Sequence, residues 1–330
     1  MTQIASRRTE VLSVQGLTVD VETATGRIRL LDEFSLEIAA GQRVAVVGES
    51  GSGKSVMARS ILQLDEDFAL SGSVQVGGRE LIGLPDKEME SVRGHQVGMV
   101  FQDPLGALNP LQTIGEQVTE PLRVRGTAAR PAHARAVQLL SELGVARAES
   151  RMKAYPHEFS GGMRQRVVLA MALIGEPRLL IADEPTTALD VRVQEQVMDL
   201  LYDVAEDRGL AVMLITHDLG IVAGFAERVV VMYSGRKVQE DAVDRTFTEP
   251  AHPYAAGLIG AVPRLDRRVD RMVEIPGAPP HPGARPSGCA YHPRCPQRFE
   301  PCSTVRPELL PLGRGGSVAC HLYREGRRES

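Results

Sequence analysis

The residues from Gly48 to Ser55 follow the apolar run Val44–Val47 and end in Gly-Lys-Ser. They match the P-loop pattern G-x-x-x-x-G-K-[ST], in which a buried strand leads through a glycine-rich loop into a helix. Glycines let successive backbone N–H groups point at phosphate oxygens, and the helix N-terminus adds partial positive charge. Lys54 is therefore predicted to reach the β- and γ-phosphates of a nucleotide, and Ser55 to bind Mg²⁺. The predicted phosphate-binding residues of this loop are Gly48, Glu49, Ser50, Gly51, Ser52, Gly53, Lys54 and Ser55.

Two adjacent carboxylates, Asp183 and Glu184, follow a second apolar run, Leu179–Ala182. Adjacent carboxylates repel each other at the end of a buried strand, so a Mg²⁺ ion explains them better than a solvated acidic turn does. Asp183 is predicted to hold Mg²⁺ through water, and Glu184 to polarise the water that attacks the γ-phosphate.

A second anion-binding device begins at Ser160, which is followed by Gly161, Gly162 and Met163. The serine is predicted to cap a helix that runs to about Ile174. Ser-Gly-Gly turns are common, so this motif alone is a weak signal. Its presence in a chain with a P-loop is unexpected, because the phosphates of one nucleotide hardly need two anion-binding motifs from the same chain.

The apolar pattern between these motifs predicts an α/β fold. Alternation from Glu10 to Ile38 indicates short antiparallel strands around a turn at Gly26. Continuous apolar runs at 179–182 and 211–215 enclose a helical stretch at 192–207, which predicts a right-handed parallel βαβ unit with the nucleotide at its C-terminal edge. Other helices are predicted at 55–64, 86–94, 113–122 and 131–147, and another strand at 71–76.

Composition narrows the class of protein. The 330 residues are 43% hydrophobic, enough for one large domain and an appendage, and the net charge of −4 gives no general attraction to nucleic acid. The first eleven residues lack the apolar segment of a secretory signal, and no apolar run approaches the ~18 residues that span a bilayer. We therefore predict a cytoplasmic chain that could dock on a membrane partner.

Taken in order, the motifs resemble those of the ATP-binding subunit of ABC transporters over about residues 10–245. Gly48–Ser55 resembles Walker A, Leu179–Glu184 resembles Walker B, and Ser160–Gln165 resembles the family signature. Counterparts of the Q-loop, the D-loop and the H-loop are Gln102, Ala188–Asp190 and Thr216–Asp218. The order is the family's own, so chance resemblance is negligible.

The resemblance implies a head-to-tail dimer in which Walker A of one subunit and the signature of the other enclose each ATP. Such a dimer would explain why one chain carries two anion-binding motifs. It implies catalytic roles for Glu184, for His217, which would contact the γ-phosphate and position water, and for Gln102, which would sense Mg²⁺. The implied signature-side contacts are Ser160, Gly161, Gly162, Met163 and Asp190, and the implied Mg²⁺ ligands are Ser55, Gln102 and Asp183.

The base-binding position departs from the family pattern. The family usually places an aromatic side chain on adenine about twenty-five residues before the P-loop, which falls near Val21, but no Phe, Tyr or Trp precedes Phe34. Val21 or Ile28 could cover the base with less area and without π-stacking. We therefore predict weak discrimination between ATP and GTP.

The subfamily is indicated by two stretches and by the C-terminal region. Met99–Pro110 and Tyr155–Phe159 resemble dipeptide and oligopeptide importers, while His252–Tyr254 and Gly257–Ile259 resemble the start of their C-terminal extension. The four cysteines all lie in this extension, at Cys289, Cys295, Cys302 and Cys320. Cytosolic thiols stay reduced, which favours zinc or an iron–sulfur cluster over disulfides. The resemblance implies a [4Fe–4S] cluster with a structural role; zinc and no metal remain alternatives.

We thus expect a P-loop NTPase ABC cassette with a mixed sheet core, an antiparallel β subdomain and a helical subdomain. The predicted bounds are 8–245 for the cassette, about 103–175 for its helical subdomain, and 246–330 for an irregular C-terminal extension. The many prolines of the extension suggest that something other than a large core holds it.

The expected function is that of the ATP-hydrolysing motor of a di- or oligopeptide importer, peripheral on the cytoplasmic face of the membrane. The expected partners are a second ATPase subunit, identical or homologous, two transmembrane permeases and an extracytoplasmic substrate-binding protein, without nucleic acid. Nickel chelates, glycopeptides and sugars are alternative cargoes, because cargo contacts lie in other chains. A soluble ABC ATPase acting on ribosomes or DNA is disfavoured because a second cassette, a coiled-coil insertion and a basic linker are absent. An exporter is disfavoured because no transmembrane segment is fused.

Overall fold

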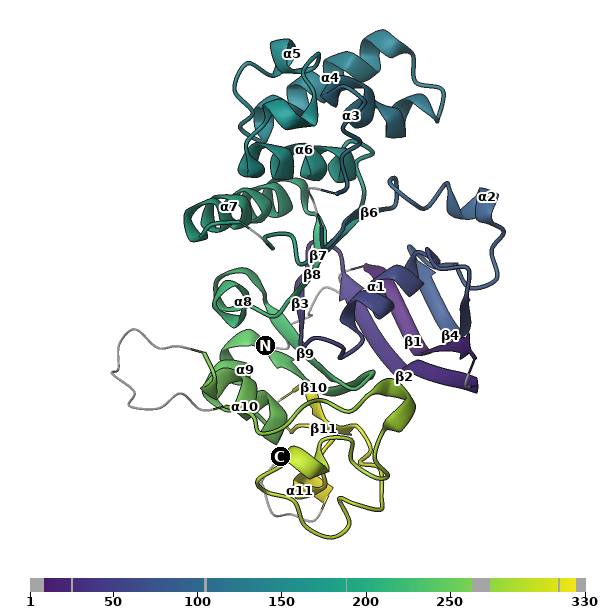
Figure 1. The fold of residues 1–330 in the computed structure, drawn as a ribbon, viewed down its shortest axis with the longest axis vertical. Helices are drawn as coiled ribbons and strands as arrows, with labels where there is room; N and C mark the ends of the chain where they lie inside the picture. The colour runs from purple at the N-terminus through teal and green to yellow at the C-terminus, as the bar shows by residue number, and fades with distance from the viewer. Residues whose placement is uncertain are drawn as a thin grey trace, which may run out of the picture. The chain divides into compact units, whose positions relative to one another are not determined.

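The computed structural model describes residues 9–24, 26–103, 106–187, 189–262, 274–313 and 315–324 (Figure 1). The chain divides into two compact units. Unit 1 comprises residues 1–12, 38–42 and 76–214, and unit 2 comprises residues 13–37, 43–75 and 215–330. Three residues of the predicted Q-loop and D-loop stretches, Pro104, Leu105 and Ala188, lie outside the described residues.

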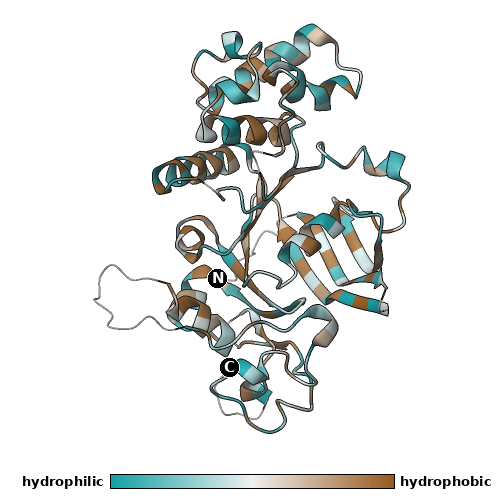
Figure 2. Ribbon diagram, viewed as in Figure 1, coloured by the Kyte–Doolittle hydropathy of each residue, from teal (hydrophilic) through white to brown (hydrophobic). Residues whose placement is uncertain are grey.

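Unit 1 contains two parallel strands, β6 (Val97–Val100) and β7 (Leu179–Asp183). Every residue of β7 is buried, as expected for a strand covered on both faces. The helix α6 (Gly161–Leu173) packs on β6, and Gly98 permits this contact because a Cβ there would lie 2.3 Å from the carbonyl oxygen of Ala172. Figure 2 shows hydrophobic residues along the central strands and both hydrophobic and hydrophilic residues on α6.

The helical part of unit 1 also contains α3 (Ile114–Arg123) and α4 (Ala129–Glu142), which pack against each other and against α6 (Figure 1). A capping box at Thr113 and Glu116 starts α3 where the sequence predicts it. The other helices of this unit are α2 (Asp86–Met89), α5 (Ala148–Arg151) and α7 (Val191–Arg208).

Three predicted helices are shorter than expected, and the one predicted at 55–64 spans Lys54–Ile61. The helix predicted at 131–147 ends at Glu142, because Gly144 turns into the left-handed region with φ of 75°. The helix predicted at 86–94 is a single turn, α2, followed by tight turns that reach Gly94, where φ is 71°. The latter two helices therefore end earlier than the apolar spacing suggests, and a glycine lies directly after the C-cap only in the segment at 131–147.

Unit 2 contains most of an N-terminal sheet in which β1 (Glu10–Thr23) lies between β2 (Gly26–Ala39) and β4 (Phe68–Val76). The hairpin turn at Gly26 is confirmed, but β1 and β2 are 14 residues each rather than short. The strand predicted at 71–76 begins earlier, at Phe68. The two-residue strand β5 (Arg79–Glu80) belongs to unit 1.

The second sheet of unit 2 runs in the order β11-β12-β10-β9-β3. The pair β3 (Arg43–Val47) and β9 (Arg228–Tyr233) is parallel, whereas β10 (Arg236–Ala242) is antiparallel to β9. The helices of unit 2 are α1 (Lys54–Ile61), α8 (Leu219–Phe225), α9 (Val243–Thr248), α10 (Pro253–Gly260) and α11 (His321–Arg324). The strand β8 (Ala211–Thr216) is divided between the two units.

The C-terminal region shares the core of unit 2. Tyr254 and Tyr291 are buried in one cluster with Val229, Val231 and Tyr233 of β9. The strand β12 (Ser317–Val318) pairs with β10, and β11 (Leu310–Pro311) pairs with β12. The expectation that something other than a large core holds the extension is therefore wrong. Tyr254 and Tyr291 are separated by many prolines in the sequence, yet both pack against β9.

Candidate functional site: the nucleotide-binding motifs

The P-loop, Gly48–Ser55, joins β3 to α1 in unit 2, as the sequence predicts. Gly51 and Gly53 have φ values of 77° and 101°, a region that favours glycine. Gly48 is required for close packing, because a Cβ there would lie 2.3 Å from the carbonyl oxygen of Met232. The loop therefore presents backbone groups where side chains would otherwise stand.

The Lys54 side chain lies inside this loop and is 5% exposed as a residue. Its Nζ donates to the carbonyl oxygens of Gly48 at 2.8 Å and Glu49 at 3.0 Å, and to the Ser52 hydroxyl at 3.4 Å. These three acceptors hold the ammonium group within the loop. The loop therefore combines a fixed cation with the N-terminus of α1, which favours phosphate.

Glu184 follows β7 in unit 1, and its backbone is in the left-handed region with φ of 48°. Such a conformation is strained for a non-glycine residue and is common at functional sites. Gln102 Nε2 donates to Glu184 Oε2 at 3.2 Å, and the Thr187 hydroxyl donates to the same oxygen at 3.0 Å. The structure thus brings together two of the predicted catalytic residues, while Asp183 beside them is buried.

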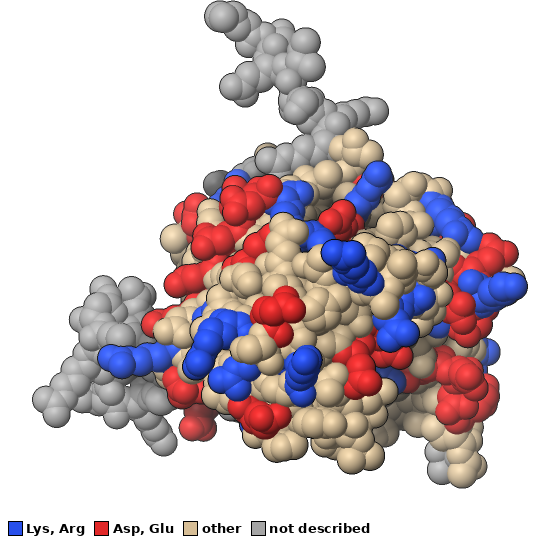
Figure 3. Space-filling view, turned by 90° about the horizontal axis from the view of Figure 1, so that it is seen from above, with Lys and Arg blue, Asp and Glu red and all other residues tan. Residues whose placement is uncertain are grey.

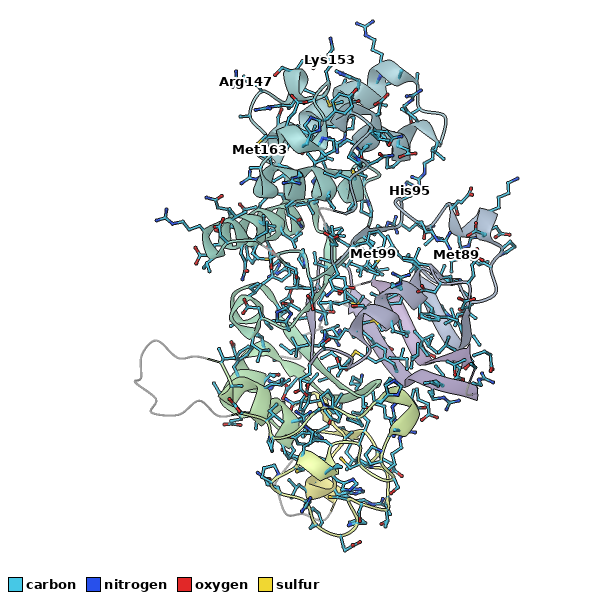
Figure 4. The ribbon with its side chains drawn as sticks, in the orientation of Figure 1. Met89, His95, Met99, Arg147, Lys153 and Met163 are labelled. Atoms are coloured by element: carbon cyan, nitrogen blue, oxygen red, sulfur yellow. The ribbon has the colours of Figure 1, made fainter. Side chains whose placement is uncertain are left out.

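The signature motif lies at the start of α6 (Figure 4, which labels Met163 there). Ser160 caps the helix as predicted, its hydroxyl accepting from the Met163 N–H at 3.4 Å. A Cβ at Gly162 would lie 2.7 Å from Val193 Cγ1 of α7. Asp190 caps α7 by accepting from the Val193 N–H at 3.0 Å, so the predicted signature and D-loop residues adjoin within one chain.

The remaining predicted residues lie in unit 2. His217 is exposed between β8 and α8, and the following Asp218 caps α8 by accepting from the Gly220 N–H at 2.9 Å. Val21 and Ile28 are half-buried on β1 and β2. Ile28 lies against the extension, because a Cβ at Gly283 would lie 3.4 Å from its Cδ1. Walker A and the H-loop histidine therefore belong to unit 2, and the Q-loop, signature and Walker B residues belong to unit 1.

Comparison with known families decides the identity of these motifs. The ABC transporter family model matches residues 31–187. An oligopeptide transport ATP-binding protein of Salmonella typhimurium, OppD, is 44% identical over 321 residues, 97% of this chain and 96% of the relative. This chain belongs to the ABC transporter ATP-binding family. It is an ATPase of the ABC cassette type, with the α/β P-loop fold that the sequence predicts.

Further comparisons place the whole chain within the ABC family. A second family model, the oligopeptide/dipeptide transporter C-terminal region, matches residues 239–302. The oligopeptide transport ATP-binding protein AppD of Bacillus subtilis is 45% identical over 90% of this chain and 92% of the relative. A post-hydrolysis dimer of an ATP-binding cassette bound to ADP and phosphate superposes with a TM-score of 0.63 and 31% identity, covering 70% of this chain and 98% of that one.

Within the described ranges, no helix is both long and apolar enough to cross a membrane. Basic and acidic side chains are interspersed across the face shown in Figure 3.

The four cysteines of the extension are not joined in disulfides. The Cys289 N–H donates to the carbonyl oxygen of Cys302 at 2.9 Å, and burial raises the pKa of the Cys289 thiol to about 12, with smaller contributions from the negative charges of Cys320, Cys302 and Cys295. However, in the part of the chain that the structure describes, no three His, Cys, Asp or Glu side chains are grouped as metal ligands. The described side chains therefore give no geometric support to the [4Fe–4S] cluster that the resemblance implies, and the case for it rests on the chemistry of its four cysteines.

Sequence reasoning missed several residues around the nucleotide motifs. Thr187 shares its acceptor on Glu184 with Gln102. Tyr254 and Arg294 of the extension contact Glu49 of the P-loop. Thr187 could have been suspected from its position three residues after Glu184. The sequence carries no signal that joins Glu49 to Tyr254, which is 205 positions away, or to Arg294, which is 245 positions away.

Proposed function

We propose that this ABC ATPase is the motor subunit of an importer for dipeptides and oligopeptides. The observation that carries the proposal is the second family match, because the oligopeptide/dipeptide transporter C-terminal region follows the cassette in the same chain. The names of the relatives, which are oligopeptide transport ATP-binding proteins, support the same cargo class.

The proposed assembly contains this subunit, a second ATPase subunit, two transmembrane permeases and an extracytoplasmic substrate-binding protein. The chain would lie on the cytoplasmic face of the membrane, bound to the permeases. The test is to purify the tagged chain with its permeases, reconstitute the complex in vesicles, and measure ATP-dependent uptake of a labelled peptide. Uptake of a nickel chelate, a glycopeptide or a sugar in place of the peptide would contradict the peptide assignment and leave the motor role intact.

We propose the following site roles, which the resemblance to ABC cassettes implies and which the contacts of Lys54, Gln102 and Glu184 support. Lys54 would bind the β- and γ-phosphates, and the Ser55 hydroxyl and the Asp183 carboxylate would hold Mg²⁺, since hard oxygen donors suit that ion. Glu184 would act as general base, with Gln102 holding its carboxylate and sensing the metal. His217 would contact the γ-phosphate. The bounds 8–245 and 246–330 are proposed for the cassette and the extension, with the helical subdomain at about 103–175.

We expect the nucleotide site to discriminate only weakly between ATP and GTP. Because Val21 and Ile28 offer no π-face, we expect the dissociation constants for MgATP and MgGTP to agree within about threefold. Val21→Tyr should tighten MgATP binding by about threefold to tenfold, since an aromatic stack adds ~0.5 to 1.5 kcal/mol. Nucleotide titration of both proteins measures this. A steep preference for ATP in the unaltered chain would refute the prediction.

A [4Fe–4S] cluster held by Cys289, Cys295, Cys302 and Cys320 is proposed on the chemistry of the donors. Four reduced thiols in one segment suit the cluster, which would cross-link that segment. Full-length protein purified without oxygen should contain about four iron atoms and four acid-labile sulfides per chain. Serine replacement of Cys302 should remove this iron and its visible absorbance. Zinc in place of iron, or no metal in freshly isolated protein, would overturn the cluster.

A further inference from the structure

We propose that Arg294 of the C-terminal extension is a positioning residue of the nucleotide site, which holds the P-loop through Glu49. Arg294 Nη1 donates to Glu49 Oε2 at 2.7 Å, and Nη2 donates to Glu49 Oε1 at 2.8 Å. The two residues are 245 positions apart in the sequence and both belong to unit 2. This two-pronged pairing fixes the direction of the Glu49 side chain as well as its charge.

The Arg294 side chain is fixed by hydrogen bonds to several groups besides Glu49. Besides Glu49, it donates to the carbonyl oxygens of Pro276 at 2.8 Å and Gly277 at 3.2 Å, and to the Tyr233 hydroxyl at 3.3 Å. These bonds and the two to Glu49 use all five N–H donors of the side chain. Its side chain is 5% exposed, and that of Glu49 is 26% exposed. The hydrogen bonds to Glu49 raise the pKa of Arg294, so the cation is permanent.

The backbone of Glu49 is fixed from both sides as well. Its N–H donates to the Tyr254 hydroxyl at 2.8 Å, and its carbonyl oxygen accepts from Lys54 Nζ at 3.0 Å. Tyr254 is fully buried, and burial raises its pKa, so its hydroxyl remains protonated. A continuous path of contacts therefore runs from Arg294 through Glu49 to the phosphate-binding lysine.

The pairing with Arg294 also reduces the repulsion between the Glu49 carboxylate and a bound phosphate. Glu49 places a carboxylate within a loop that is built to receive phosphates, and like charges repel strongly where water is excluded. Arg294 neutralises that carboxylate and turns its oxygens toward the extension. Without the arginine, the unpaired carboxylate would oppose the nucleotide, so Arg294 acts on affinity although it lies outside the cassette motifs.

The loop that carries Arg294 is rigid enough for this role. It contains a short 3₁₀ helix, His292–Arg294, and is bounded by Cys289 and Cys295. The Arg294 N–H donates to the carbonyl oxygen of Tyr291, a buried residue of the core that the extension shares with β9. The arginine therefore reaches Glu49 from a fixed base.

The test compares MgATP binding by full-length variants. Arg294→Met should weaken binding by tenfold or more, seen as a higher dissociation constant and a higher KM with a smaller change in kcat. Arg294→Lys keeps the charge and loses the paired geometry, so its affinity should fall between Arg294→Met and the unaltered chain. Arg298→Met removes an exposed arginine four residues further along the chain and serves as the matched control.

The decisive variant is the double change Glu49→Gln with Arg294→Met. If Arg294 acts by neutralising and holding Glu49, removing the carboxylate should restore affinity to within about threefold of the Glu49→Gln single variant. A residue with a merely structural role would give additive losses instead. The proposal is overturned if Arg294→Met and Arg294→Lys bind like the Arg298→Met control. It is also overturned if Glu49→Gln brings no recovery while thermal unfolding shows an intact fold.

Discussion

Glu184→Gln should abolish most ATP turnover while the chain still binds MgATP. Glutamine has the same size, and its amide oxygen can still accept from Gln102 and Thr187, as Glu184 does. It cannot take a proton from the attacking water, however, and a general base contributes about 10²- to 10⁴-fold to such a reaction. We therefore expect steady-state turnover, measured by phosphate release, to fall by at least about a hundredfold. ATP should also trap the proposed head-to-tail dimer, which light scattering would detect.

Glu176→Gln provides a matched control for this experiment. Glu176 is another glutamate of unit 1 with a positive φ, of 54°, and its carboxylate pairs with Arg135 on the surface. Its replacement should leave turnover unchanged. If Glu184→Gln hydrolyses ATP at the unaltered rate, Glu184 is not the catalytic base and the strain at its backbone needs another explanation.

Ser160→Arg should remove turnover without weakening the binding of nucleotide to the isolated chain. In the proposed head-to-tail dimer, Ser160 faces the ATP held by the partner, so a bulky cation there blocks closure over that ATP. Lys54→Met is the contrasting variant, because Lys54 lies inside the chain's own P-loop. We expect at least a tenfold loss of affinity for Lys54→Met and none for Ser160→Arg, as measured by nucleotide titration of the separate chain.

A second measurement separates the loss of the helix cap from the block. Ser160→Ala also removes the hydroxyl that caps α6, which costs about 1 kcal/mol of folding stability. Thermal unfolding of the alanine and arginine variants should therefore shift by similar amounts, while only the arginine adds bulk and charge. If Ser160→Arg lowers affinity in the isolated chain as far as Lys54→Met does, the signature serves its own P-loop and the head-to-tail arrangement is wrong.

The motifs were predictable because each is local. The P-loop and the helix-capping signature each occupy a few consecutive residues, and their function depends on glycine backbones and helix starts that those residues themselves specify. The strands β7 and β8 were predictable for a similar reason, since continuous apolar runs are needed wherever both faces are covered. The ends of α2 and α4 were less predictable, because apolar spacing continues past the residues where the two helices end.

The amino-acid sequence by itself determined the fold family and the order of the nucleotide motifs, and it predicted the residues that would carry their chemistry. Only the tertiary structure decided which distant residues support them: Gln102 against Glu184, and Arg294 and Tyr254 against Glu49. It also decided that the extension completes the core around β9. The physical reason is that a capping or phosphate-binding loop is specified by its own backbone, whereas an ion pair across 245 residues depends on the packing of the chain between them.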